Sequence, residues 1–237
     1  MTTRRLPRAH RATVALAAGA LLTALTGCST LASASPTAQP SPAPSPTSTR
    51  HSATVTAVAI GDSIAIGNGV PADDAWPLLV ADRFGWTLSD FAESAAGFTV
   101  KGLNTHTFDD QVSAAIRLHP EVVLIAGTRN DVFAGTPALK TAVTSALQRL
   151  RTALPDARII GVGPLWGSEK APAQIAVIDS TVKAAVLAVD GTWVELGQPF
   201  EGRSDLVQAD HVHPTVEGQQ LLAQKIANGI ASQSSQR

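Results

Sequence analysis

The 237-residue chain lacks several features that would point to particular classes of protein. It has one cysteine, which excludes an internal disulfide and a zinc site built from several cysteines. The formal net charge is −1, and there is no basic stripe or long run of one charge, so nothing indicates a nucleic-acid partner. The chain also has no internal repeat, and its amino-terminal apolar run is too short for a comfortable membrane span.

The amino-terminal 27 residues have the layout of a secretory signal. Four arginines between Arg4 and Arg11 form a basic head without acidic residues, and an apolar run rich in Ala and Leu follows. The segment ending at Cys28 reads LTGC, which resembles the bacterial lipobox, whose cysteine is lipidated. We therefore predict a lipoprotein signal peptide at 1–27 and lipidation of Cys28. The alternative is a buried free cysteine.

The next segment, 28–52, is dominated by Ser, Pro, Thr and Ala and has almost no large apolar residue. Such a composition cannot bury enough surface to offset its ordering entropy, and its prolines favour extended conformations. We predict a disordered tether at 28–52, a single folded domain at 53–232 and a flexible tail at 233–237. The expected location is extracytoplasmic, on the cell membrane through the lipid anchor or secreted.

Within the domain, short apolar runs alternate with segments of helical periodicity. The predicted strands are 54–60, 86–91, 121–126, 158–162 and 192–196, and helical patterns lie between and after them. This alternation indicates an α/β fold with a parallel sheet of about five strands, covered by helices on both faces. Sites in such sheets form at the carboxyl ends of the strands.

Polar residues that can carry out acyl transfer follow several of these strands. Ser63 comes after the first strand and can act as the nucleophile, while His213 can take its proton. Asp210, three residues before His213, can orient the imidazole. The backbone N–H groups of Ser63 and Gly97 and the side-chain amide of Asn130 can stabilise an oxyanion. Gly97 suits this task because it has no side chain to hinder the turning of its N–H.

Taken together, these segments resemble the SGNH (GDSL-type) serine hydrolases. The first block matches GDSI at Ser63, the glycine block SAAGFT at Gly97, the asparagine block GTRND at Asn130, and the last block DHVHP at Asp210 and His213. The asparagine block has one residue, Arg129, more than the commonest form. The resemblance implies a flavodoxin-like three-layer α/β/α fold and hydrolysis of esters or thioesters without a metal or other cofactor.

Each motif also has another interpretation. Read alone, Gly-Asp-Ser after a strand is ordinary turn chemistry, and Asp62 and Asp131 are expected to cap or support loops. The segment from Asp210 to His213 contains two histidines and a carboxylate, which are suitable zinc ligands. The segment Gly67–Ala72 imitates a dinucleotide fingerprint, but it does not join a strand directly to a helix and Pro71 interrupts it. We favour the hydrolase interpretation because four blocks occur in one order.

The predicted function is hydrolysis of carboxylic esters through an acyl-enzyme on Ser63. The alternative is a non-catalytic envelope lipoprotein that binds a ligand or glycan on the same fold. Short predicted loops favour small acyl groups such as acetyl, on a small-molecule or glycan substrate. Phe98, Arg129 and Trp166 are candidates to line the pocket, with a packing role as the alternative for each. A monomer without metal or cofactor is expected.

Overall fold

The computed structural model describes residues 54–234, which contain a five-stranded, fully parallel sheet with the strand order β2-β1-β3-β4-β5. The strands are β1 (Thr56–Ile60), β2 (Thr87–Asp90), β3 (Val122–Ala126), β4 (Arg158–Val162) and β5 (Thr192–Val194). The predicted α/β class, strand number and strand direction are therefore confirmed.

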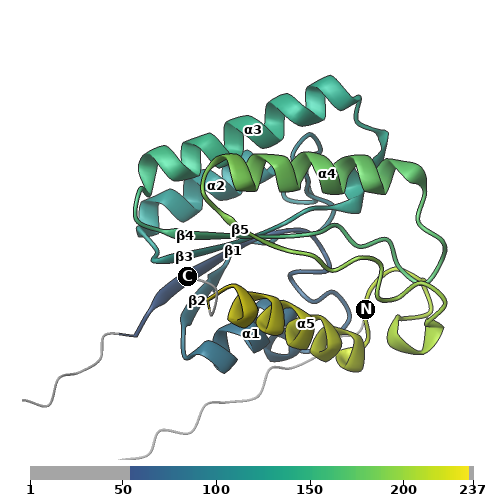
Figure 1. Ribbon diagram of the computed structural model, residues 1–237. Helices are drawn as coiled ribbons and strands as arrows, with labels where there is room; N and C mark the ends of the chain where they lie inside the picture. The colour runs from purple at the N-terminus through teal and green to yellow at the C-terminus, as the bar shows by residue number, and fades with distance from the viewer. Residues whose placement is uncertain (1–53, 235–237) are drawn as a thin grey trace, which may run out of the picture. The chain divides into compact units, whose positions relative to one another are not determined.

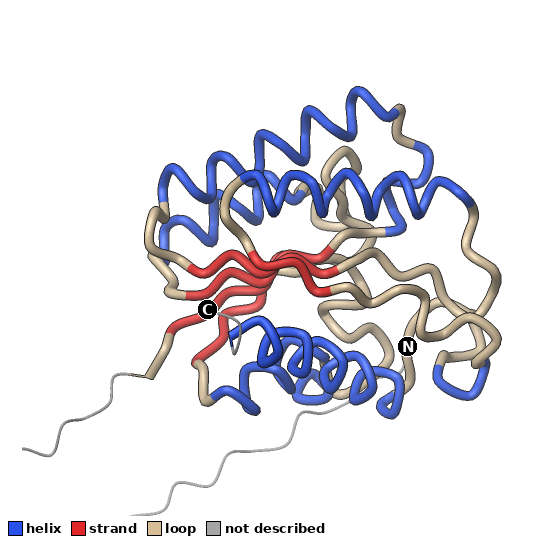
Figure 2. The backbone as a smooth tube through the Cα atoms, viewed as in Figure 1, coloured by secondary structure: helices blue, strands red, loops and turns tan. Residues whose placement is uncertain are grey.

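Five α-helices cover the sheet on its two faces. They are α1 (Trp76–Phe84), α2 (Phe108–Leu118), α3 (Thr136–Ala153), α4 (Ala173–Ala188) and α5 (Val216–Ser234). Helices α1 and α5 lie on one face, and α2, α3 and α4 lie on the other (Figure 1). The tube view shows the sheet as the middle of three layers (Figure 2). This arrangement confirms the predicted three-layer α/β/α architecture.

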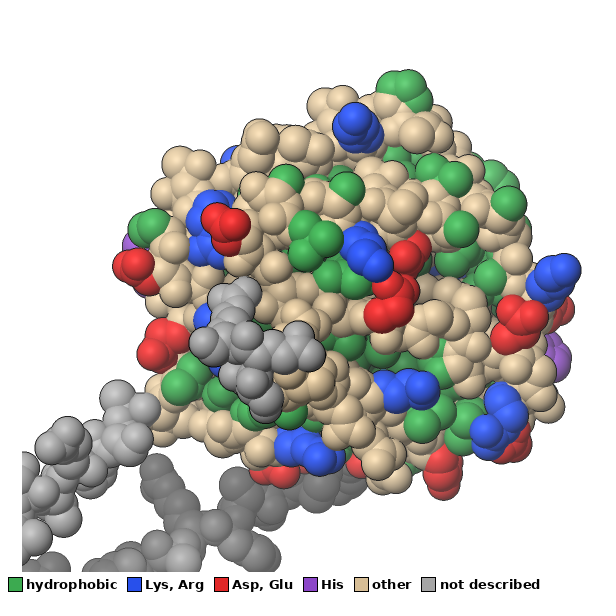
Figure 3. All heavy atoms as spheres, viewed as in Figure 1, with side chains coloured by type: hydrophobic (Ala, Val, Ile, Leu, Met, Phe, Trp, Pro, Cys, Tyr) green, Lys and Arg blue, Asp and Glu red, His purple; other side chains and the backbone are tan. Residues whose placement is uncertain are grey.

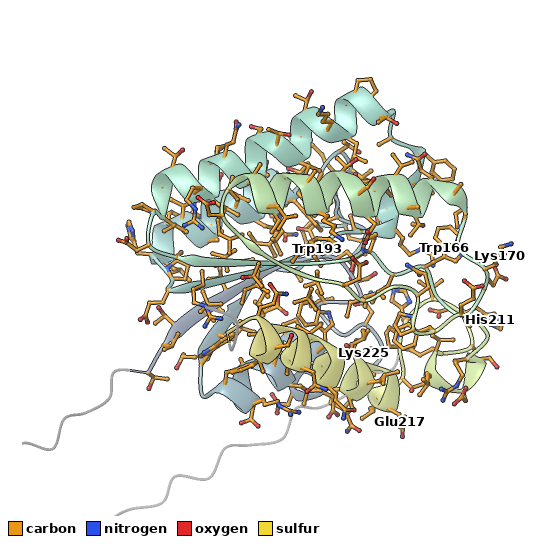
Figure 4. The ribbon with its side chains drawn as sticks, in the orientation of Figure 1. Trp166, Lys170, Trp193, His211, Glu217 and Lys225 are labelled. Carbon is orange, nitrogen blue, oxygen red and sulfur yellow. The ribbon has the colours of Figure 1, made fainter. Side chains whose placement is uncertain are left out.

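The two hydrophobic cores follow from the pleat of the central strands. Alternate residues of a strand point to opposite faces, so Ile125 packs with α2, α3 and α4, whereas Leu124 packs with α1 and α5. All five residues of β3 are buried, which is why its sequence is continuously apolar. Trp193, on the edge strand β5, packs beside Gly161 of β4 on the face covered by α4 (Figure 4).

The strand order places a switch point beside β1. The chain runs outward from β1 to β2 on one side and then returns to β3 on the other. In parallel sheets, ligands bind beyond the carboxyl ends of the strands at such a point. Because Ser63 follows β1 and Asn130 follows β3, both lie at this edge.

Three details differ from the sequence-based expectations. Helix α5 begins at Val216 rather than Pro214, because Pro214 forms an antiparallel bridge with Val207. The same helix continues to Ser234, past the predicted domain end at 232. The segments 91–107 and 195–215, between strands and helices at the carboxyl edge, are also longer than the expected short loops.

The predicted signal peptide, Cys28 and the tether lie outside the described residues. Within 54–234, no helix is both long and apolar enough to cross a membrane. On the face seen in Figure 3, acidic and basic side chains are interspersed.

Candidate active site

A chain of hydrogen bonds joins three of the predicted site residues. The Oγ atom of Ser63 lies 2.9 Å from Nε2 of His213, and Nδ1 of the same ring lies 2.6 Å from Oδ2 of Asp210. The loop after β1 thus meets the loop before α5, although Ser63 and His213 are 150 positions apart in the sequence. Nucleophile, base and orienting carboxylate have the connectivity of a serine-hydrolase triad.

Asp210 is held in its orienting position by its own loop. Its Oδ1 atom accepts the backbone N–H groups of Val212 (2.9 Å) and His213 (3.0 Å). Partial burial raises the pKa of Asp210, but the hydrogen bonds from the side chain and backbone of His213 and from Val212 outweigh it and lower the pKa to about 2. Asp210 therefore stays ionised at neutral pH and can stabilise a protonated imidazole.

The turn that presents Ser63 is fixed by neighbours on both sides. Oδ1 of Asp62 accepts the N–H of Ile64 at 2.9 Å, which is the capping role expected of Asp62. The carbonyl of Ser63 accepts the N–H of Asn68 at 3.0 Å. Before the turn, the buried side chain of Gln111 accepts the N–H of Gly61 (2.9 Å) and donates to its carbonyl (3.0 Å). Ser63 is thus presented from a rigid strand end.

Asn130 is linked to the Ser63 turn through a buried threonine. Thr128 accepts the N–H of Asn130 at 3.1 Å and donates its hydroxyl proton to Oδ2 of Asp62 at 2.5 Å. Burial raises the pKa of Asp62, although the hydroxyl of Thr128 and the N–H groups of Ile64 and Ala65 oppose this rise. The side-chain amide of Asn130 donates to the carbonyl of Ala96 at 2.8 Å. One of its two N–H bonds is thereby used, and the other has no acceptor between residues 54 and 234.

The backbone N–H of Gly97 is not turned toward a ligand, in contrast to the expectation from the sequence. Its N–H donates to the carbonyl of Val100 at 2.9 Å, so this donor is engaged inside its own loop rather than turned toward a ligand. Its backbone φ is not positive. The requirement for glycine comes instead from Asp131, because a Cβ at Gly97 would lie 2.9 Å from Oδ1 of Asp131.

Asp131 supports the glycine loop, as expected of a capping residue. It is fully buried, and its carboxylate accepts the N–H groups of Phe98 and Thr99, each at 2.9 Å. The hydroxyl of Thr99 donates to the same carboxylate at 2.6 Å. Phe98 is itself buried and packs edge-to-face on Phe108 with ring centroids 4.8 Å apart, so its role is packing.

His211 points away from the hydrogen-bonded chain. Its Nδ1 lies 3.2 Å from Oγ of Ser168, while both ring nitrogens of His213 are used by Asp210 and Ser63. The two histidines therefore do not converge on one point. Across residues 54–234, no group of three His, Cys, Asp or Glu side chains is placed to hold a metal ion.

Two glutamines that the sequence analysis did not single out tie the site together. Gln208 donates through its side chain to the carbonyls of Asn68 (2.7 Å) and Pro214 (3.0 Å), and so connects the Ser63 turn with the His213 loop. Gln219, buried on α5, accepts the N–H of Trp76 and donates to the carbonyl of Ile64, each at 3.0 Å. The glycine at 69 fits against Gln208, where a Cβ would overlap the amide.

Arg129 and Trp166 pack on each other, and the charge of Arg129 interacts with that of Asp210 in the hydrogen-bonded chain. The guanidinium carbon of Arg129 lies 3.8 Å from the ring centroid of Trp166, and the group also donates to the carbonyl of Trp166. The loop that carries Trp166 continues to Ser168, whose N–H donates to the carbonyl of His211 at 3.0 Å. Trp166 and His211 both lie beyond the carboxyl ends of the strands (Figure 4).

A known protein family and an individual relative are similar to this chain in sequence. The profile of the GDSL-like lipase/acylhydrolase family matches residues 59–221. A GDSL lipase of Mycobacterium tuberculosis is 27% identical over 157 residues, which cover 64% of this chain and 68% of that protein.

Solved structures share the fold. A psychrotrophic esterase from a Pseudoalteromonas species, inhibited by monoethylphosphonate, superposes with a TM-score of 0.62 at 18% identity over 76% of this chain and 98% of that one. A family two carbohydrate esterase from Clostridium thermocellum, in complex with cellohexaose, gives a TM-score of 0.63 at 20% identity over 76% and 65%. The chain belongs to the GDSL-like lipase/acylhydrolase family and is a carboxylic ester hydrolase.

Proposed function

We propose that this chain is an extracytoplasmic serine esterase that hydrolyses short-chain, chiefly acetyl, esters through an acyl-enzyme on Ser63. The observation that carries the proposal is the hydrogen-bonded chain from Ser63 through His213 to Asp210. It supplies a nucleophile, a base in contact with it and a carboxylate that keeps the base oriented.

In the proposed reaction, Oγ of Ser63 forms a bond to the ester carbonyl carbon while Nε2 of His213 takes the hydroxyl proton. The N–H of Ser63, which has no acceptor among the described residues, and the second N–H of the Asn130 amide stabilise the oxyanion. Collapse expels the alcohol, which receives the proton from His213. Water then attacks the acyl-enzyme with His213 as base, which releases the acid and regenerates Ser63.

Two observations bear on the acyl group. The cavity behind the Ser63 turn, lined by Asp62, Ile64 and Ala126 among others, has a volume of about 10 Å³, which is space for about one water molecule, so it offers no buried channel for a long acyl chain on that side of the turn. The fold is also shared by a carbohydrate esterase in complex with cellohexaose, so an acetylated glycan of the cell envelope is a fitting substrate.

The proposed location depends on the amino-terminal segment. The arginine-rich head, the apolar run and the LTGC segment that ends at Cys28 support export and lipid anchoring. Metabolic labelling with a palmitate analogue tests this directly. The full chain is expected to be labelled and Cys28→Ser is not, whereas equal labelling of both would contradict an anchor at Cys28.

The enzymatic proposal is tested with 4-nitrophenyl esters of increasing acyl length and with a fluorophosphonate probe. We expect the wild type to prefer acetate and to be labelled on serine, and Ser63→Ala to lose both hydrolysis and labelling. Ser180→Ala, which removes an exposed hydroxyl bonded to the carbonyl of Val177 on helix α4, is the matched control. An unlabelled, folded wild type without esterase activity would favour a binding protein instead.

A further inference from the structure

Arg129 is a half-buried cation without a carboxylate partner in the part of the chain that the structure describes. Among the described residues, no Asp or Glu oxygen lies within 4.0 Å of its guanidinium, whereas Arg149 and Arg203 each have one. Burial lowers the pKa of Arg129, and the nearby charges of Asp62, Asp210 and Glu169 oppose this. A charged group that is partly withdrawn from water without a partner is costly, so a reason for its position is needed.

The position of the guanidinium is fixed by Trp166. The group lies 3.8 Å from the centroid of the indole ring and donates one N–H to the carbonyl of Trp166. The other N–H groups of the planar guanidinium have no hydrogen-bond acceptor among the described residues. The side chain is therefore held in one position, and several of its N–H groups can still donate to a ligand.

The guanidinium is close enough to the hydrogen-bonded chain to interact electrostatically with it. Arg129 lies between Thr128 and Asn130 in the sequence. Its charge interacts with that of Asp62, which precedes Ser63, and with that of Asp210, which orients His213. The loop carrying Trp166 is in turn docked on His211, since a Cβ at Gly167 would overlap the carbonyl of His211.

We propose that Arg129, held by Trp166, recognises a negatively charged group on the alcohol part of the substrate. The natural substrate class is then an acetyl ester of an acidic alcohol, such as an acetylated glycan that carries carboxylates. The inference rests on the proposed esterase function, in which the acyl group is small, so that the charge must lie on the alcohol. A guanidinium binds a carboxylate through two parallel hydrogen bonds, which gives it both charge and shape selectivity.

The test compares matched acetates that differ in charge. The anionic substrates are 3- and 4-carboxyphenyl acetate, and the neutral ones are 3- and 4-carbamoylphenyl acetate. The measured quantity is the ratio of kcat/KM for the anionic ester to that for the neutral ester. We expect Arg129→Gln to lower this ratio about tenfold or more and Arg129→Lys to lower it less, because lysine keeps the charge but not the planar fork.

The control is Lys170→Gln, which removes a positive charge from an exposed residue of the same loop as Trp166 (Figure 4). Its ratio is expected to match that of the wild type. The inference would be overturned if Arg129→Gln lowered kcat/KM equally for the anionic and the neutral esters. It would also be overturned if Lys170→Gln lowered the ratio as much as Arg129→Gln does. The melting temperature of each variant shows whether it has folded.

A binding measurement separates failure of this inference from failure of the esterase proposal. Isothermal titration with 3- and 4-hydroxybenzoate, against 3- and 4-hydroxybenzamide, needs no turnover. We expect the wild type to bind a hydroxybenzoate more tightly than its amide, and Arg129→Gln to lose that preference. If no ester is hydrolysed but this preference is present, the esterase proposal fails and the anion site stands. If esters are hydrolysed without any charge preference, only the anion site fails.

Discussion

The hydroxyl of Thr128 lies 2.5 Å from Oδ2 of Asp62 and joins the carboxyl ends of the two strands β1 and β3 at the switch point of the sheet. Ser63 immediately follows Asp62. Asn130 follows Thr128 by two residues and donates its backbone N–H to the hydroxyl oxygen of Thr128. The relative positions of the proposed nucleophile and the proposed oxyanion donor thus depend on one buried side-chain contact.

Thr128→Val is therefore expected to weaken both stability and activity. The valine has the same shape but leaves the buried Asp62 without its hydroxyl donor and the N–H of Asn130 without its acceptor. The free energy of unfolding should fall by about 1–3 kcal/mol, and kcat/KM by about tenfold. Urea unfolding and ester hydrolysis measure the two effects. Thr128→Ser keeps the hydroxyl and should restore most of both, and a fully stable, active valine variant would contradict this account.

Asp210→Asn is expected to lower kcat by about 10²–10⁴-fold, because the amide no longer stabilises a protonated imidazole or enforces the productive tautomer. The fold should persist, since the Asp210 side chain is 46% exposed. Asp205→Asn, which breaks the surface pair with Arg203, is the control for loss of one negative charge and should leave kcat near wild type. Comparable rates in wild type and Asp210→Asn would remove Asp210 from its proposed role.

The low pKa of Asp210 also has a consequence for the pH profile. Because this pKa is about 2, below the ordinary value of 3.8, Asp210 remains ionised as the pH falls from 7 to 4. The loss of kcat/KM over this interval should then reflect other groups, and the profile should show no additional break near pH 4 in wild type. A plot of log kcat/KM against pH with such a break, absent in Asp210→Asn, would show that the carboxylate titrates normally.

Much of the fold was predictable because its signals are local. Short apolar runs such as 121–126 and helical spacing between them suffice to indicate a parallel sheet with helices on both faces. The sequence also predicted that Ser63, Asp210 and His213 lie near one another, because strand ends of a parallel sheet share an edge. The structure shows the hydrogen bonds that join them.

The supporting contacts were not predictable because they have no local pattern. Gln111, Gln208 and Gln219 bind main-chain groups 50 to 155 positions away in the sequence, and glutamine is not a residue type that signals catalysis. The engagement of the Gly97 N–H by Val100 likewise depends on the path of a loop, which motif spacing does not describe. A candidate signal in the sequence was the polar residue Thr128, two positions after the end of the apolar strand β3.

Gly97→Ala tests the structural reason for glycine at that position. The added Cβ would lie 2.9 Å from Oδ1 of the fully buried Asp131, whose carboxylate is fixed by the N–H groups of Phe98 and Thr99. We expect the free energy of unfolding to fall by about 1–3 kcal/mol. Gly135→Ala, where a Cβ meets nothing within 4 Å, should change it by less than about 1 kcal/mol. Equal effects of the two alanines in urea unfolding would exclude crowding by Asp131.

Asp90, at the end of β2, should make the protein less stable as the pH rises. Burial raises its pKa from 3.8 to about 6, although the N–H of Ala92 donates to Oδ1 at 2.8 Å. The native state therefore binds more protons than the unfolded chain between about pH 4 and 6, and the free energy of unfolding falls as the pH rises through this window.

The substitution Asp90→Asn tests this, because asparagine cannot ionise but keeps an oxygen that can accept the N–H of Ala92. We expect urea unfolding to give equal stabilities near pH 4 and an advantage of about 1–3 kcal/mol for Asp90→Asn at pH 8. Asp73→Asn, on an exposed residue, should follow the wild type, and an Asp90→Asn variant no more stable at pH 8 would show that this carboxyl titrates normally.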